Sequence, residues 1–131
     1  MVLVDTLNDT TYDEQVKEFL NGKVPRPAVV ALIDGTVVGA CTYKDFSKDD
    51  VVRVELSMYM APKARKLTLS LNNSLVLRAV AQFKAKYTSG EIFVRLGNAK
   101  ISDQVMQYLG FKYKHLLEGN PHDIRYYSMA I

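Results

Sequence analysis

The chain has 131 residues and a mass of 14.8 kDa, a size that predicts one domain spanning 1–131 with a sizeable core. Hydrophobic residues make up 48% of it and charged residues 24%, which is a globular composition and excludes extended disorder. The net charge of +3 permits an anionic ligand but is small for a protein that binds nucleic acid, so a nucleic-acid partner is not expected.

Cysteine content and apolar pattern bear on the location of the protein. A single cysteine, Cys41, cannot form a disulfide within the chain, which favours a reducing compartment. We find no basic segment followed by an apolar run at the start and no apolar stretch near the roughly 18 residues of a membrane span, so neither a signal peptide nor membrane insertion is predicted. One cysteine and two histidines give no zinc pattern, so no metal site is predicted, and the expected location is the cytoplasm.

The first predicted elements are a helix and a hairpin. Residues 11–23 place three apolar side chains on one face, with acidic residues early and Gly22 after the end, which predicts a short helix. In residues 28–46, two β-branched runs flank Asp34 and Gly35. This dipeptide suits a type I′ turn, so the two runs are predicted to pair as a hairpin.

Strands and helices are predicted to alternate in the middle of the chain. Residues 51–60 alternate between apolar and polar side chains, which predicts a strand that Pro62 ends. From about 68–87 the apolar residues recur every three or four positions, as on one face of a helix. Another strand is predicted at 91–96 and a short helix at 103–109.

The final predicted elements are two strands, at 111–117 and 124–131, around a polar turn. The whole order is helix, hairpin, strand, long helix, strand, short helix, hairpin. It implies right-handed crossovers with locally parallel pairing in the middle and antiparallel pairing at the edges. The predicted fold class is therefore α/β (α+β), with a mixed central β-sheet and helices on both faces.

The turn before the long helix is the strongest candidate for a binding site. Lys63, Arg65 and Lys66 lie just before a helix N-terminus, whose first N–H groups lack partners and carry partial positive charge. A pyrophosphate suits such a place. Phosphate-binding turns usually carry glycines, whereas this one carries Thr68 and Ser70, whose hydroxyls can donate to the same oxygens or cap the helix. From the residues alone, two interpretations of this turn remain open: a binding site for an anion and a solvated basic turn without a ligand.

The element order and two local sequences resemble the GNAT family of N-acetyltransferases, over roughly residues 28–129. The first local sequence is the strand-to-helix turn, YMAPKARKLTLSL. Pro62 and Arg65 match the family's pattern there, while Thr68 and Ser70 stand at the positions of its glycines. The resemblance implies that this turn holds the pyrophosphate of a CoA thioester.

The second local sequence is MQYLGF, which is similar to the end of the family's fourth helix. Leu109, Gly110 and Phe111 match, whereas Met106 stands at the family's usual tyrosine. Asn98, just after the strand 91–96, resembles the family's asparagine beside the pantetheine arm, with a shift of one residue; its alternative is a loop residue that bonds its own backbone.

The resemblance implies transfer of an acetyl group from acetyl-CoA, as co-substrate, to a primary amine by direct attack. Acetyl-CoA would lie between the strand that ends at Met60 and the strand that starts at Glu91. The resemblance implies ten cofactor-binding candidates: Met60, Ala61, Arg65, Lys66, Leu67, Thr68, Leu69, Ser70, Asn98 and Ser102. Ser102 has a second interpretation as a helix cap.

Two catalytic candidates follow from the same resemblance. Glu55 is the candidate general base, with the alternative that it pairs across the sheet with a lysine or arginine. Because Met106 cannot donate a proton to the departing thiolate, Tyr108 is the candidate acid, although it lies about 200° further around the helix. Tyr113, Tyr126 and Tyr127 on the neighbouring strands are further candidates, and the alternative for all four tyrosines is packing at the sheet surface.

A different class of function is left open by these departures from the family pattern. The missing glycines and tyrosine favour a GNAT-like binding or structural protein with weak or no catalysis, similar to compact bacteriophage proteins, some associated with the virion. The location would then be host cytoplasm or virion. The acceptor, a small molecule or a protein, and a homodimeric state are not readable from the sequence.

Overall fold

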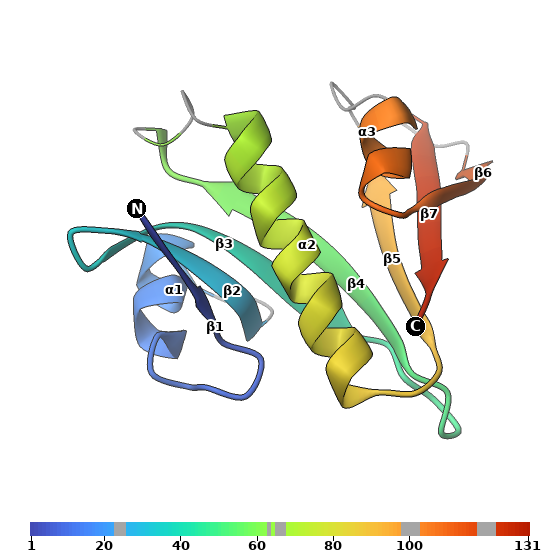
Figure 1. The fold of residues 1–131 in the computed structure, drawn as a ribbon, viewed down its shortest axis with the longest axis horizontal. Helices are drawn as coiled ribbons and strands as arrows, with labels where there is room; N and C mark the ends of the chain where they lie inside the picture. Colours follow the sequence, from blue (N-terminus) through green and yellow to red (C-terminus); the bar gives the residue numbers. More distant parts are fainter. Residues whose placement is uncertain (23–25, 63, 65–67, 98–102, 118–122) are drawn as a thin grey trace. The chain divides into compact units, whose positions relative to one another are not determined.

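The computed structural model describes residues 1–22, 26–62, 64, 68–97, 103–117 and 123–131, with the backbone alone at 68–70 and 117 (Figure 1). The elements in chain order are β1 (Val2–Asp5), α1 (Asp13–Phe19), β2 (Arg26–Ile33), β3 (Thr36–Asp45), β4 (Arg53–Met60), α2 (Thr68–Lys86), β5 (Glu91–Leu96), α3 (Asp103–Tyr108), β6 (Lys112–Leu117) and β7 (Ile124–Ala130). None of the helices in these residues is long and apolar enough to cross a membrane.

The strands of the described residues form a seven-stranded sheet in the order β1-β2-β3-β4-β5-β7-β6. The β4–β5 pair is parallel, whereas the β1–β2, β2–β3, β5–β7 and β6–β7 pairs are antiparallel. The predicted mixed α/β sheet is therefore confirmed. The chain divides into two compact units. The first unit is Met1–Lys44 with Leu56–Lys86, and the second unit is Asp45–Glu55 with Tyr87–Ile131.

The first unit is built around the β2–β3 hairpin. Asp34 and Gly35 have φ values of 51° and 77°, the positive angles of the predicted type I′ turn. Val30 and Leu32 of β2 pack with Val16 of α1, and Val29 and Ala31, which alternate with them along β2, are buried as well. Because neighbouring side chains of a strand point to opposite faces, both faces of the hairpin are covered. Figure 1 shows α1 on one face and α2 along the other.

The strand β1 was not predicted, and α2 explains its position. β1 is a short strand that pairs antiparallel with β2, with Leu3 opposite Ala31. Arg78 of α2 donates from Nε to Asp5 at 2.8 Å and from Nη1 to the Leu3 carbonyl oxygen at 3.2 Å. These partners lie more than 70 residues away in sequence, so no local pattern near the N-terminus contains them.

Cys41 lies within β3 and is fully buried. Burial raises the pKa of its thiol to about 12, so the thiolate, which is the reactive form, is suppressed at neutral pH. In this environment Cys41 is a small packed residue of the core and not a nucleophile.

The second unit combines the start of β4 with β5, β7 and β6. β4 and β5 pair in parallel from Arg53 opposite Glu91 to Glu55 opposite Phe93. The implied parallel crossover after α3 would place β6 beside β5, but β7 lies between β5 and β6 and pairs antiparallel with both. α3 ends as predicted, with Gly110 at a φ of 94° and the Phe111 N–H donating to the Met106 carbonyl oxygen at 2.9 Å.

Candidate functional site

Two ion pairs cross the parallel β4–β5 pair in opposite directions. Arg53 of β4 donates from Nε to Glu91 Oε1 of β5 at 2.9 Å. In the reverse sense, Arg95 of β5 holds both carboxylate oxygens of Glu55 on β4, with an Nη2–Oε1 distance of 2.8 Å. The alternation of side chains along each strand places all four groups on one face of the sheet. This face therefore carries fixed, mutually oriented charges.

Tyr126 of β7 joins the first of these pairs. Its hydroxyl accepts a hydrogen bond from Arg53 Nη2 at 2.7 Å and donates one to Glu91 Oε1 at 2.9 Å. Burial is the main cause that raises the pKa of Tyr126. Burial opposes the charged form of Arg53, yet the bonds to Tyr126 and Glu91 leave the Arg53 pKa above its ordinary value. Arg53 thus stays a cation and Tyr126 a neutral phenol.

A column of stacked groups runs across the four strands of this face. The Arg53 guanidinium lies 4.1 Å from the centroid of the Phe93 ring. Phe93 stacks on Tyr126 at 5.2 Å and 14°, and Tyr126 stacks on His115 at 4.8 Å and 8°. These centroid spacings match the distance between neighbouring strands, so the rings stand on the sheet with their faces against one another. Their edges are left toward the open side.

A register shift in β6 brings two polar side chains to the end of this column. Tyr113 lies opposite Tyr127 and His115 lies opposite Tyr126, so Lys114 is an extra residue between two consecutive partners. Such a β-bulge re-aims neighbouring side chains. Lys114 and His115 both line the cavity described next.

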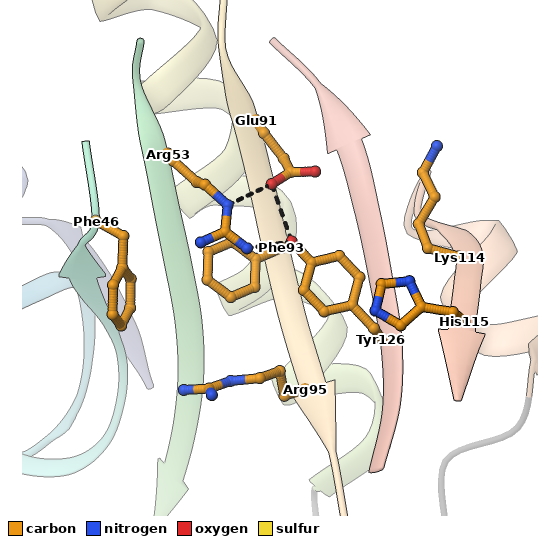
Figure 2. Close-up of a pocket in the computed structure, with 8 residues that line it drawn as sticks. All are labelled: Phe46, Arg53, Glu91, Phe93, Arg95, Lys114, His115 and Tyr126. Carbon is orange, nitrogen blue, oxygen red and sulfur yellow. Dashed lines mark hydrogen bonds and ion pairs between the residues drawn. The ribbon is translucent and has the colours of Figure 1, made fainter. Parts of the chain in front are cut away.

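These side chains enclose a cavity of about 540 Å³, which lies wholly within the second unit (Figure 2). We call it the basic pocket, and its lining is Phe46, Arg53, Glu91, Phe93, Arg95, Lys114, His115 and Tyr126. Its volume falls in the range of small-molecule sites. In the described part of the chain, no group of three or more His, Cys, Asp or Glu side chains is placed to hold a metal ion.

The two catalytic candidates from the sequence lie in different settings. Glu55 is 9% exposed and held by Arg95, so its contacts are those of the alternative interpretation, a carboxylate paired across the sheet. Its role as a base stays a prediction. Tyr108, at the end of α3, is 70% exposed, while Met106 is buried in the core of the second unit. The helix therefore points Tyr108 outward, as the angular separation of the two residues requires.

Most of the cofactor-binding candidates lie outside the part of the chain whose side chains the structure describes. Arg65, Lys66, Leu67, Asn98 and Ser102 lie outside the described residues, and of Thr68, Leu69 and Ser70 only the backbone is described. Those three form the first turn of α2, in which no acidic residue occurs.

The described part of this turn belongs to the first unit. The Ala61 N–H donates to the Val38 carbonyl oxygen of β3 at 2.7 Å, and the Ala64 N–H donates to the Ala61 carbonyl oxygen at 2.9 Å. Ala64 is fully buried, and Met60 is half-buried with its Sδ in the space that Gly39 leaves open. The turn is thus fixed to β3 on one side and continues into α2 on the other.

A second tyrosine makes a separate network beside α3. The Tyr127 hydroxyl donates to Asp103 Oδ1 and accepts from Arg125 Nη1 at 3.0 Å. Tyr126 and Tyr127 were both alternatives for the missing tyrosine of the family pattern, and each hydroxyl is engaged with charged groups of its own unit.

The basic pocket was not predicted as a site. The alternation of residues 51–60 puts Arg53 and Glu55 on one side of the strand, but their partners on β5 depend on the register of the β4–β5 pair. A signal was available in the alternation of EIFVRL, where Glu91, Phe93 and Arg95 fall on one face. The register of the β5–β7 pair sets Arg95 opposite Tyr126 and so brings Tyr126 beside these charged side chains.

Comparisons with known proteins show which solved structures share this fold. No protein-family model and no curated protein sequence matches the chain. Solved structures do match it. A GNAT-superfamily phosphinothricin acetyltransferase from Sinorhizobium meliloti, crystallised with AcCoA, aligns with a TM-score of 0.68 and 21% identity over 99% of this chain and 88% of its own.

Two further structures support the same likeness. A ribosomal-protein-alanine N-acetyltransferase from Brucella melitensis aligns with a TM-score of 0.68 and 21% identity over 96% of this chain and 81% of its own. Arabidopsis thaliana Naa50, in complex with the bisubstrate analogue CoA-Ac-MVNAL, aligns with a TM-score of 0.64 and 14% identity over 99% and 98%. The fold of this chain is therefore that of GNAT acetyltransferases.

Proposed function

We propose that the protein transfers an acetyl group from acetyl-CoA to a primary amine. The observation that carries this proposal is the fold, which matches acetyltransferases over nearly the whole chain, including structures solved with AcCoA or a CoA-based analogue. The chain's own residues fit an anionic co-substrate. α2 is a helix of 19 residues that follows β4 through a basic turn, and its first turn carries no acidic side chain.

In the proposed reaction the amine nitrogen attacks the thioester carbonyl carbon. A C–N bond forms, the C–S bond breaks, the nitrogen loses one proton and the CoA thiolate gains one. Holding the two reactants in this geometry supplies most of the acceleration, and a positioned acid or base adds roughly 10²–10⁴-fold. Glu55 is the proposed base, after one of its bonds to Arg95 opens. Tyr108 is a weaker proposal for the acid because its hydroxyl is exposed.

Binding of acetyl-CoA is the first test of this proposal. Calorimetric titration of the protein is expected to give saturable binding of acetyl-CoA and of desulfo-CoA, with ATP as the control for a nucleotide alone. Arg65→Glu is expected to weaken acetyl-CoA binding at least about tenfold, because it replaces a cation beside the pyrophosphate with an anion. Binding that Arg65→Glu leaves unchanged would show that this turn is not the cofactor site.

The role of Glu55 has a separate test. Glu55→Gln keeps the size of the side chain but cannot take a proton, so kcat for acetylation of an amine acceptor is expected to fall roughly 10²-fold. The Kd for acetyl-CoA is expected to stay within about twofold, since Glu55 is proposed to act on the amine and is not among the proposed cofactor-binding residues. An unchanged kcat would leave Glu55 as a structural partner of Arg95 only.

A second candidate function is a GNAT-fold binding protein without catalysis. Two observations favour it: Met106, at the position of the family's tyrosine, is buried in the core, and both oxygens of Glu55 are engaged by Arg95. Acetyl-CoA binding without turnover on a panel of amine acceptors would favour this function over the enzyme.

A further inference from the structure

We propose that the basic pocket binds a small organic molecule through a carboxylate group. The pocket lies wholly in the second unit, and the proposal does not depend on acetyl transfer. It rests on the charge of the lining, on guanidinium N–H groups that the bonds among the described residues do not use and on the orientation of the aromatic rings.

The charge of the pocket favours one negative charge on the ligand. Three permanent cations line it, Arg53, Arg95 and Lys114. Glu91 in the lining and Glu55, which is paired with Arg95, supply two negative charges, so one positive charge is left over. A carboxylate balances this excess, whereas a phosphate dianion would bring an additional negative charge next to Glu91.

The two guanidinium groups keep donors for such a ligand. Each guanidinium has five N–H groups. The described bonds of Arg53, to Glu91 and Tyr126, use two of them, and the described bonds of Arg95 to Glu55 also use two. Because the existing bonds fix the planes of both groups, the remaining N–H groups are held in place before a ligand arrives. Figure 2 shows both side chains on the same face of the β4–β5 pair.

The aromatic column adds to the attraction for an anion. Arg53 covers Phe93, and Tyr126 is stacked between Phe93 and His115, so the electron-rich faces of Phe93 and Tyr126 are occupied. The ring edges, which carry the positive part of the quadrupole, are what the rings offer to the open side. A cationic ligand would find neither a free ring face between these groups nor an excess of negative charge.

The register shift in β6 supplies the third cation. Lys114 is the extra residue of the shift and lines the pocket together with His115. Lys112, two positions earlier on β6, is exposed and does not line it. The two lysines differ in their relation to the pocket but share a strand and a charge, which makes them a matched pair for an experiment.

The test is an amide NMR titration of the full chain with phenylacetate, phenylacetamide and inorganic phosphate. Phenylacetate is expected to give saturable shifts at the pocket strands, and phenylacetamide, which has the same shape without the charge, to bind at least about tenfold more weakly. Lys114→Met is expected to weaken phenylacetate binding about fivefold, and Lys112→Met to change it less than about twofold. Arg53→Lys, which keeps the charge but loses the planar fork, is expected to weaken it about tenfold.

Several results would overturn the proposal. These are equal binding of phenylacetate and phenylacetamide, no saturation up to about 50 mM phenylacetate, or shifts outside the pocket strands. Tighter binding of inorganic phosphate than of phenylacetate would mean that the pocket takes a phosphate ligand and not a carboxylate. Shifts that follow the protein concentration rather than the phenylacetate concentration would mean that a second copy of the chain covers the pocket. The spectrum of each free variant shows whether it is folded, so loss of structure is not mistaken for loss of binding.

Discussion

Replacing Gly90 by alanine is expected to lower the free energy of unfolding by about 3 kcal/mol or more. Gly90 has a φ of +142°, a conformation that side chains rarely allow. A Cβ there would lie 2.7 Å from the Val52 carbonyl oxygen and 2.8 Å from Val52 Cβ. That carbonyl oxygen accepts the Glu91 N–H at 2.9 Å, and the Gly90 carbonyl oxygen accepts the Ile131 N–H at 2.9 Å. Relief of the clash therefore moves backbone that carries strand hydrogen bonds.

Gly22→Ala is the matched control for this prediction. Gly22 has a similar φ of +131°, but a Cβ there would meet no atom of the described residues within 4 Å. The Gly22→Ala substitution is expected to lower the free energy of unfolding only through backbone strain, by about 1 kcal/mol. Denaturant unfolding of both variants gives the two free energies, and their difference isolates the contact with Val52. Equal losses would show that the backbone around Val52 yields easily and that the contact argument is wrong.

Local patterns predicted most of the fold because most of its elements are specified locally. The Asp34–Gly35 turn needs positive φ at both residues, and this dipeptide tolerates it. The strand at 91–96 and the helix at 68–87 carry clear periods of two and of three to four residues, and β5 and α2 follow them closely. β1 has only four residues and is held by Arg78 of α2, so its own sequence says little about its pairing.

Strand order is the part of the topology that local patterns did not contain. A strand, a helix and a strand suggest a parallel neighbour, and this holds for β4 and β5. For β6, pairing with β7 through a short hairpin connection competes with pairing to β5. The observed order places β7 between them, so that β5 and β6 both pair with this one strand. The outcome depends on long-range packing rather than on the sequence of either strand.

The candidate site was predictable only in part, for a related reason. Pairing of Glu55 with a basic residue was one of two interpretations of that position, and Arg95 supplies it from two residues beyond the directly opposite Phe93. The contacts among Arg53, Glu91 and Tyr126 need the registers of two strand pairs at once. The basic turn is a different case: Arg65 lies outside the described residues, so its role in binding acetyl-CoA stays a prediction from the family resemblance.

Above about pH 10 the protein is expected to lose roughly 2–3 kcal/mol of stability through Tyr127. Tyr127 is 1% exposed, and burial, followed by its hydrogen bond to Asp103, raises its pKa to about 12. In the unfolded chain the tyrosine pKa is about 10. Between these values the unfolded state releases the proton while the folded state keeps it, so stability falls as pH rises. Below about pH 10 both states are protonated, and the contribution is fully present.

Tyr127→Phe removes this titration and supplies the measurement. The variant is expected to lose about 1 kcal/mol near neutral pH, where the bonds to Asp103 and Arg125 are gone. Because it lacks the ionising hydroxyl, its unfolding free energy falls less with pH, so the two curves are expected to cross at about pH 11, and the variant is the more stable protein above that pH. Cys41 has its pKa raised into the same range in both proteins, and its contribution therefore cancels in the comparison.

Tyr108→Phe is the control for this comparison, because Tyr108 is 70% exposed and belongs to the same unit. Its curve of unfolding free energy against pH is expected to run parallel to that of the wild type. If the curve of Tyr127→Phe also ran parallel to the wild type, Tyr127 would ionise like an exposed tyrosine. The bond that joins β7 to the first residue of α3 would then be absent in solution.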